Sequence, residues 1–285
     1  SASVAARAAA QAERLGAEAH VLTPSVDLAA PGGLENAART ARHDALEHLA
    51  RERGALAVLL GHTLDDQAEQ VLMALARGAG PRALAGIRRS RGHLLRPFLG
   101  TGRDETTALR RADTEEICTL HDLEWWEDPM NADPELLRSR VRHRALPLLR
   151  EILGEQIDEN LARSADLVRP DVDHLDEEAR ALLPALRRDA GELAEEGDLL
   201  HLDVHALAAV PAPVRTRVLR DASRSAQRAI DAGDAGGSTK SLLRRQVLAL
   251  DALVVSWHGQ AAVPVPGRIE VARRDGLLVW RRPAP

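Results

Sequence analysis

The chain has 285 residues, of which 45% are hydrophobic, and a formal net charge of −5 at pH 7. This length suffices for two modest domains, and the negative charge excludes a uniformly basic RNA-binding protein, so that any RNA contact must come from local arginine patches. Cys118 is the single cysteine, which excludes an intramolecular disulfide and a cysteine-rich zinc site. No apolar stretch approaches the roughly 20 residues of a membrane span, so we expect a soluble cytoplasmic protein with no membrane partner.

Helices and strands are expected to alternate in the first part of the chain. The pattern predicts helices over 3–15 and 34–53, and strands over 19–23 and 55–60. The run 55–60 is continuously apolar, as is typical of a strand buried on both faces of a parallel sheet. The alternation favours an α/β fold with a doubly wound parallel sheet. Because the first predicted element is a helix, we expect this sheet to be partial.

A polar cluster follows the strand 55–60, where ligands bind in open α/β sheets. Four of its side chains fall at i, i+3, i+4 and i+7, on one side of a helix that Gly78 ends: His62, Asp65, Asp66 and Glu69. Their opposite face is apolar: Ala68, Val71, Leu72 and Leu75. An imidazole and three carboxylates that converge could hold Mg²⁺ or transfer protons. Helix capping is the alternative, because Thr63-x-x-Asp66 is a capping-box pattern.

Two further segments offer arginines to phosphates. The segment 77–89 is rich in glycine and arginine and includes Arg77 and Arg82, so it could cradle phosphate or contact RNA backbone, although a helix cap with a turn is the better local interpretation. Arg138 and Arg142 would share one face of a helix, whereas Arg140 would join them only on an extended strand. A solvated basic helix start is an equal alternative to phosphate binding there.

From residue 146 the pattern is mainly helical. Four helices are expected, followed by a hairpin around Asp275-Gly276: 146–153, 155–183, 207–230, 243–254, and the hairpin 267–280. His201 and His205 are four residues apart, but no third ligand is near in sequence, so a zinc site is not expected. Upstream, a strand is expected to end within 94–99 and a helix to cover 103–120.

Three stretches resemble the tRNA(Ile)-lysidine synthase family of the PP-loop ATP pyrophosphatase superfamily. They are Glu-Asn-Ala-Ala-Arg-x-x-Arg at 35–42, Gly-His-Thr-x-Asp-Asp-Gln-Ala-Glu with Arg-Gly-Ala-Gly at 61–80, and Asp-Pro-x-Asn-x-Asp with Arg-x-Arg-x-Arg-His at 128–143. The resemblance implies an adenine nucleotide alpha hydrolase-like α/β domain over 1–135. It implies a mainly helical tRNA-binding domain with a C-terminal hairpin over 136–285.

The resemblance also implies a function and its residues. The family uses ATP to adenylate O2 of the wobble cytidine of an isoleucine tRNA with a CAU anticodon, and the side-chain amine of free lysine then displaces AMP. Asp66, His62 and Arg42 would be catalytic, with Asp66 as a Mg²⁺ ligand or base. Arg42, Asp66 and Arg140 would bind ATP. The tRNA would be bound by Arg77, Arg82, Arg138, Arg140 and Arg142, and the protein could form a homodimer.

Other interpretations stay open at this stage. From spacing alone, Arg42 and its neighbour Arg39 read as a solvated helix face. The family's ATP-binding loop, Ser-Gly-Gly-x-Asp-Ser, does not occur in the sequence. We therefore expect either an incomplete chain, which we favour, or a non-catalytic tRNA-binding remnant, and we expect these residues alone to be inactive. A related RNA thiolase would need paired cysteines, and Cys118 alone argues against it.

Overall fold

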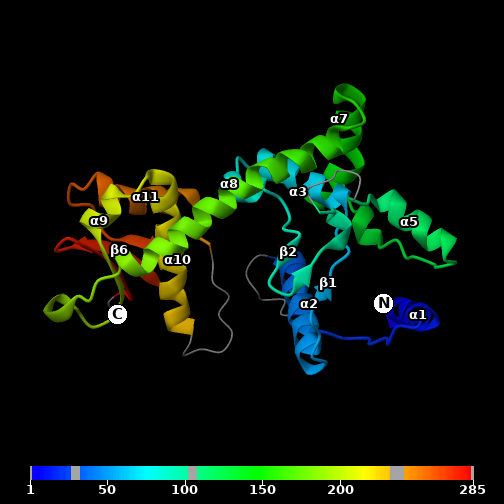
Figure 1. The fold of residues 1–285 in the computed structure, drawn as a ribbon, viewed down its shortest axis with the longest axis horizontal. Coiled ribbons are helices and arrows are strands. Elements are labelled where there is room, and N and C mark those ends of the chain that lie inside the picture. The colour runs from blue at the N-terminus through cyan, green and yellow to red at the C-terminus, as the bar shows by residue number, and fades with distance from the viewer. Residues whose placement is uncertain (1, 27–32, 102–107, 232–240, 284–285) are drawn as a thin grey trace. The chain divides into compact units, whose positions relative to one another are not determined.

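The computed structural model describes residues 2–26, 33–101, 108–231 and 241–283, and the chain divides into two compact units, Ser1–Arg169 and Pro170–Pro285 (Figure 1). The boundary expected between residues 135 and 136 falls inside the first unit. Residues beyond 135 belong to that unit because Arg138 and Arg142 form ion pairs with Glu69. None of the helices in the described part of the chain is long and apolar enough to cross a membrane.

The first unit is built from helices around a small three-stranded sheet. After α1 (Ala2–Arg14) and α2 (Gly33–Glu52) come β1 (Val58–Leu59) and α3 (Leu64–Ala76). The short helix α4 (Pro81–Leu84) precedes the hairpin of β2 (Ser90–Arg91) and β3 (Leu94–Leu95). The sheet order is β1-β3-β2, in which β1 is parallel to β3 and β2 is antiparallel to it. The fold class is α/β, as predicted.

One strand prediction was wrong, and a second is confirmed only in part. Residues 19–23 form no strand, and Val21 and Leu22 are 54% and 41% exposed, because no described residue pairs with this segment. The strand expected over 55–60 is reduced to β1 and is not buried on both faces, since Leu56 is 97% and Leu59 is 66% exposed. An apolar run becomes a buried strand only where neighbours cover both of its faces.

The helix α3 supports the site and matches its prediction closely. Gly78 follows the helix with φ +60, a left-handed conformation that glycine adopts without strain, and its N–H donates to the Leu75 carbonyl. Ala68 and Val71 are buried as expected, whereas Leu75 is 51% exposed. Ala68 and Met73 pack with Val141 and Leu146 in a small core.

Helices complete the first unit after β3. They are the 3₁₀ turns η1 (Pro97–Leu99) and η3 (Pro129–Ala132), α5 (Arg111–Leu120), α6 (Leu137–Arg140), the π-helical turn η4 (Val141–Ala145), and α7 (Leu146–Leu153). Much of the helix expected over 103–120 is therefore α5, and residues 102–107 lie outside the described part. The 30-residue helix α8 (Ile157–Leu186) begins in the first unit and ends in the second.

The second unit adds a sheet to the expected helices. Beyond the 3₁₀ turn η5 (Gly191–Leu193), its remaining elements are β4 (Asp198–Asp203), α9 (Val204–Ala209), α10 (Ala212–Asp231), α11 (Arg244–Val255), β5 (Val263–Val265), β6 (Ile269–Arg274) and β7 (Leu277–Arg281). The antiparallel sheet has the order β4-β7-β6-β5. The predicted hairpin is confirmed as β6 and β7. The helix predicted over 207–230 is divided, because Pro211 lies between α9 and α10.

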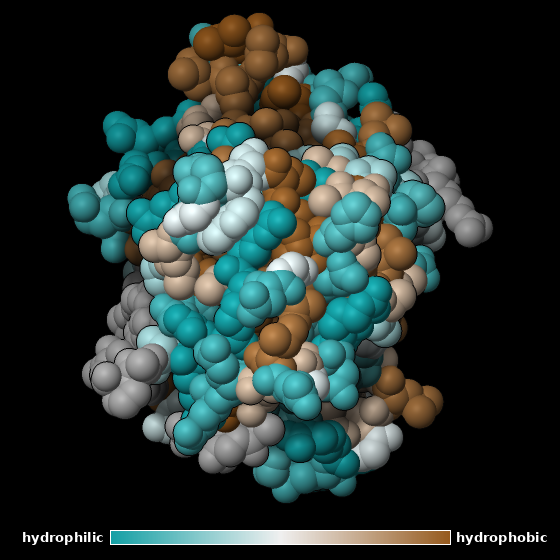
Figure 2. Space-filling model, turned by 90° about the vertical axis from the view of Figure 1, so that its left-hand side faces the viewer, coloured by the Kyte–Doolittle hydropathy of each residue, from teal (hydrophilic) through white to brown (hydrophobic). Residues whose placement is uncertain are grey.

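The core of the second unit is large and apolar. It includes Trp280, Leu202 and Leu219, all 0% exposed, together with the apolar faces of α10 and α11. The indole Nε1 of Trp280 donates a hydrogen bond of 2.9 Å to the Ser223 hydroxyl, so its one polar atom is satisfied inside the core. Figure 2 shows hydrophilic residues over much of the face that it presents, with apolar groups between them and a larger apolar group at the top of the view.

Candidate functional site

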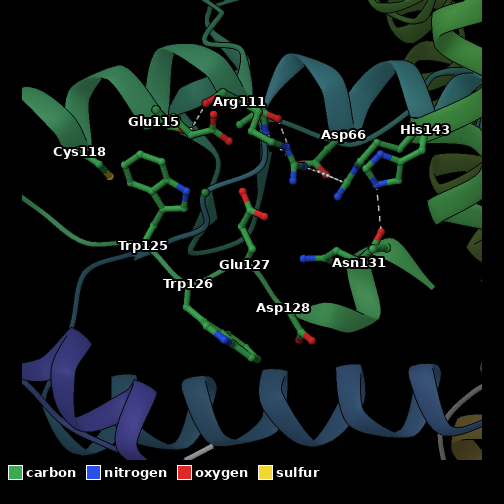
Figure 3. A pocket seen from close by; sticks show the side chains of 15 residues that line it. Asp66, Arg111, Glu115, Cys118, Trp125, Trp126, Glu127, Asp128, Asn131 and His143 are labelled. Carbon is green, nitrogen blue, oxygen red and sulfur yellow. Dashed lines mark hydrogen bonds and ion pairs between the residues drawn. The ribbon is translucent and has the colours of Figure 1, made fainter.

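The first unit contains a pocket of about 480 Å³ beside the N-terminal end of α3. Three elements form its walls: the turn before α3 with Gly61 and Thr63, one side of α5, and the segment from Trp125 to Ala132. Arg142 and His143 from η4 complete it. Figure 3 shows these side chains directed toward a common space, with Asp66 and His143 on one side and Trp125 on the other.

Asp66 lies in the pocket wall and caps α3. Its Oδ2 accepts hydrogen bonds from the Thr63 N–H at 2.9 Å and from the Thr63 hydroxyl at 3.2 Å. The capping alternative is therefore confirmed for Asp66. Its other oxygen, Oδ1, faces three guanidinium groups, those of Arg138 at 3.4 Å, Arg142 at 3.6 Å and Arg111 at 3.8 Å. One carboxylate thus caps a helix with one oxygen and presents the other to a cationic cluster.

Asp65 connects α3 with α5. Its Oδ2 accepts a hydrogen bond of 2.8 Å from the backbone N–H of Arg111, the first residue of α5. Because the N-terminal end of a helix is partially positive, this carboxylate stabilises α5 in its place beside the pocket. Asp65 therefore positions the pocket wall that carries Arg111.

Glu69 is fully buried, with 0% exposure, and holds two arginines. Arg142 donates to it from Nε at 2.6 Å and from Nη2 at 3.1 Å, and Arg138 donates from Nε at 2.7 Å. A buried carboxylate requires such partners because its desolvation costs several kcal/mol. The predicted common face of Arg138 and Arg142 is confirmed by these contacts. Burial alone would lower the pKa of Arg142, but hydrogen bonding and attraction to Glu69 raise it.

His62 lies at the edge of this cluster in neutral form at pH 7. Burial chiefly, together with the cationic groups of Arg96, Arg39 and Arg138 and against the opposing effect of Asp66, lowers its pKa to about 4. Its Nδ1 is buried and has no hydrogen-bond partner among the described residues. A neutral imidazole with an unengaged nitrogen can accept a proton, but a pKa of about 4 makes this one a weak base at pH 7.

The remaining predicted site residues lie in different surroundings. Arg42 is exposed on α2 and does not line the pocket. Arg140 points back along the chain and donates to the carbonyls of Pro134 and Glu135 at 2.9 and 3.0 Å. Arg77 is exposed at the C-terminal end of α3, and Arg82 lies in α4. The pocket thus contains Asp66 and Arg142 of the predicted set, with Arg138 and His62 close to Asp66.

The prediction that one imidazole and three carboxylates converge on one point is wrong. Within the described residues, no three His, Cys, Asp or Glu side chains are placed to hold a metal ion. The reason is that each carboxylate has its own partner: Asp65 binds the α5 N-terminus, Asp66 caps α3, and Glu69 pairs with two arginines. With three guanidinium groups around Asp66, the arrangement suits an anion better than a cation.

Several pocket residues were not predicted. Arg111, Trp125 and Trp126 line the pocket, as does Asn131, whose carbonyl oxygen contacts His143 Nε2 at 3.1 Å. The sequence could have indicated Trp125 and Trp126 as pocket residues, because two adjacent tryptophans stand out in a chain that has only four. The role of Arg111 could not have been inferred, because it depends on how Asp65 places α5 in space.

Comparison with known proteins connects this pocket to a family. The family model described as a PP-loop domain matches residues 3–149, slightly more than half of the chain. The chain is 43% identical over 282 residues to the tRNA(Ile)-lysidine synthase of Leifsonia xyli subsp. xyli, covering 98% of this chain and 76% of the relative. It is 44% identical over 290 residues to that of Mycolicibacterium paratuberculosis, covering 99% and 80%. With its PP-loop domain and these relatives, the chain belongs to the tRNA(Ile)-lysidine synthase family.

Proposed function

We propose that the protein acts as an ATP-dependent ligase that attaches lysine to C2 of the wobble cytidine of an isoleucine tRNA. The proposal is supported by its relatives, which carry the name tRNA(Ile)-lysidine synthase. The observation that carries it in this chain is the cluster of Asp66, Arg111 and Arg142 in the wall of the pocket. Free lysine, ATP and a tRNA with a CAU anticodon are the proposed substrates.

The reaction has two steps that this cluster suits. First, O2 of the cytosine attacks the α-phosphorus of ATP, and the bond to the β-phosphate oxygen breaks so that pyrophosphate leaves. Arginines placed at the pocket stabilise the negative charge that builds up on the departing phosphates. Second, the lysine side-chain amine attacks C2, the C2–O2 bond breaks, and AMP leaves with that oxygen.

The second step also releases protons from the amine, which need an acceptor. Asp66 presents Oδ1 to the guanidinium cluster beside the pocket, and His62 is neutral at pH 7 with Nδ1 unengaged. We assign proton transfer to these two side chains. Arg138 would act together with Arg142 from the same face. ATP or tRNA phosphates would be contacted by the exposed Arg42, Arg77 and Arg140 and by the partly buried Arg82.

Mg²⁺ commonly accompanies the phosphates of ATP. Asp66 fits a direct Mg²⁺ ligand poorly in the arrangement described, because guanidinium groups lie 3.4–3.8 Å from its Oδ1. None of the proposed steps therefore requires a metal ion at that atom. We also propose that the protein forms a homodimer and is located in the cytoplasm, but none of the steps above depends on either property.

The test measures lysine incorporation. The protein is incubated with ATP, labelled lysine and an unmodified isoleucine tRNA transcript, and lysidine is identified by mass after nuclease digestion. Asp66→Asn retains a side-chain oxygen that can cap α3, and we expect it to lower the rate about 100-fold. Asp113→Asn is the matched control, because Asp113 caps α5 in the same way through the Arg110 N–H at 2.7 Å.

The outcomes separate the proposal from its alternative. Lysidine formed by the unmodified chain, and lost with Asp66→Asn but not with Asp113→Asn, supports the ligase and overturns the expectation that these residues alone are inactive. Tight tRNA binding without ATP binding or lysidine formation would indicate the alternative function, a tRNA-binding protein that does not catalyse the reaction. A chain that binds neither tRNA nor ATP would contradict both functions.

A further inference from the structure

Two tryptophans line the pocket without belonging to any core. Trp125 and Trp126 lie in the irregular segment between α5 and η3, and they are 47% and 45% exposed. Figure 3 shows the Trp125 indole beside Cys118 and the Trp126 indole turned toward α2. Both side chains nevertheless line the pocket, so both offer aromatic surface to whatever occupies it. We use the name aromatic wall for Trp125 and Trp126.

The other two tryptophans of the chain, unlike Trp125 and Trp126, have partners within the protein that explain their positions. Trp280 is 0% exposed and donates its N–H to Ser223. Trp257 is 40% exposed, but Arg273 covers its ring at 5.6 Å from the centroid. No such cation–π contact is found for the aromatic wall in the part of the chain that the structure describes. Large half-exposed aromatic side chains that line a pocket are typical of ligand contacts.

The polar groups around the aromatic wall match an unstacked nucleobase. Glu127 and Asn131 point into the same space (Figure 3), and both line the pocket with Arg142. A carboxylate accepts a hydrogen bond from the exocyclic amine of cytosine, and an amide can both donate and accept at a base edge. Arginines nearby bind the phosphates that connect successive nucleotides. Aromatic stacking, base-edge hydrogen bonding and phosphate contacts are the three components by which proteins recognise single-stranded RNA.

We propose that the aromatic wall stacks the wobble cytosine of the tRNA anticodon loop and thereby holds this target base in the pocket. This inference rests on the proposed function, since it assigns the way in which that site takes its RNA substrate. The adenine of ATP has a similar flat face and is the competing occupant. The RNA base is favoured because the wall lies on an exposed surface segment, where a loop of a large substrate can enter.

The test compares two RNAs with the full 285-residue chain. One is an anticodon stem-loop with cytosine at the wobble position, and the other carries an abasic residue there. We expect the cytosine RNA to bind about 5- to 150-fold more tightly, as measured by fluorescence anisotropy, because one stacked base is worth that much. We expect Trp125→Ala or Trp126→Ala to remove most of this preference. Trp257→Ala is the matched control and should retain it, because Trp257 is also half exposed but lies in the second unit.

Each outcome decides the inference. Equal binding of the two RNAs by the unmodified chain would overturn it while leaving tRNA binding intact. Retention of the preference in both Trp125→Ala and Trp126→Ala would overturn it as well. If these variants weaken ATP binding instead and leave the preference unchanged, the wall belongs to the nucleotide and the inference is wrong. A folded chain that binds neither RNA would contradict the proposed function itself.

Discussion

The two units of the chain are stabilised in different ways. In the second unit, 20 of the described buried residues form one apolar core. In the first unit, the corresponding cluster beside the pocket contains four, and buried charges such as Glu69 and Asp158 lie within the unit. Ion pairs in a protein interior often stabilise less than a packed apolar group would. The second unit buries charged residues as well, including Asp176 and Arg215, so the clearest difference between the two units is the size of the described apolar core.

The largest effect is expected in the apolar unit. Trp280→Ala would leave a cavity in the core and remove the hydrogen bond to Ser223, so we expect the free energy of unfolding of the second unit to fall by about 3–5 kcal/mol. Hydrogen exchange read by peptide mass should accelerate in β4, β6 and β7 and remain unchanged in α3. Equal acceleration in both units would contradict the expectation that this core stabilises the second unit alone.

A somewhat smaller effect is expected when a buried charge in the first unit is removed. Glu69→Gln keeps the shape but leaves Arg138 and Arg142 without their carboxylate, and we expect a loss of about 3 kcal/mol. Urea unfolding with hydrogen exchange in α3 as the local readout measures it. Glu116→Gln, at an exposed position on α5, is the control and should be nearly neutral. A neutral Glu69→Gln would show that the first unit does not depend on this network.

Mild acid should weaken the first unit before the second. The pKa of His62 is lowered to about 4 in the folded state from 6.5, so the unfolded state binds the proton more readily. Stability from this residue is thus complete above pH 6.5 and is lost as the pH falls toward 4, by about 2 kcal/mol after solvent screening. His62→Gln should flatten this dependence, and His48→Gln, at an exposed position on α2, should not.

The second unit should respond to acid only at lower pH. Burial would raise the pKa of Asp198, but hydrogen bonds from His201, the Glu195 N–H and Arg274 together lower it below its usual 3.8. The stability it contributes is present above that value and is lost as the pH falls below it. Peptide-resolved hydrogen exchange at pH 5 should therefore detect opening in α3 but not in β4. The reverse order would contradict the assignment of the acid response to these groups.

The smallest effect is expected at Arg140. Its contacts are two hydrogen bonds to backbone carbonyls at an exposed turn, so Arg140→Ala should cost about 1 kcal/mol or less in stability. If Arg140 also contacts tRNA phosphate, the same variant should reduce tRNA affinity. The slope of log binding constant against log salt concentration should then become shallower by about 1. An unchanged salt dependence would remove Arg140 from the proposed tRNA surface.

Local signals in the sequence predicted local structure well. The capping pattern of Thr63 and Asp66, the glycine stop at Gly78 and the turn at Asp275-Gly276 all have the expected conformations. These features depend on neighbours within a few residues. The strand expected over 19–23 failed because a strand needs a distant partner, and β4 was missed for the same reason.

In the candidate site too, local geometry could be predicted from the sequence, whereas contacts between distant residues could not. Helical spacing predicted that Arg138 and Arg142 face one way, and both meet Glu69. Spacing could not show that Arg111 would join them, since that depends on a contact between Asp65 and the start of α5, 46 residues apart. Nor could it show that each carboxylate would have a separate partner, which is why the described residues do not form the expected cluster of metal ligands.

The π-helical turn η4 gives this part of the chain a local tolerance to changes in length. Its five residues, Val141–Ala145, follow α6 and precede α7, and the wide turn takes up an additional residue between them. Deleting one residue there would restore an ordinary helix and leave Leu146 and Arg150 on the faces that they now occupy. The same deletion in α7 between Leu146 and Arg150 would rotate the residues beyond it by about 100°, and Arg150 would lose Asp158.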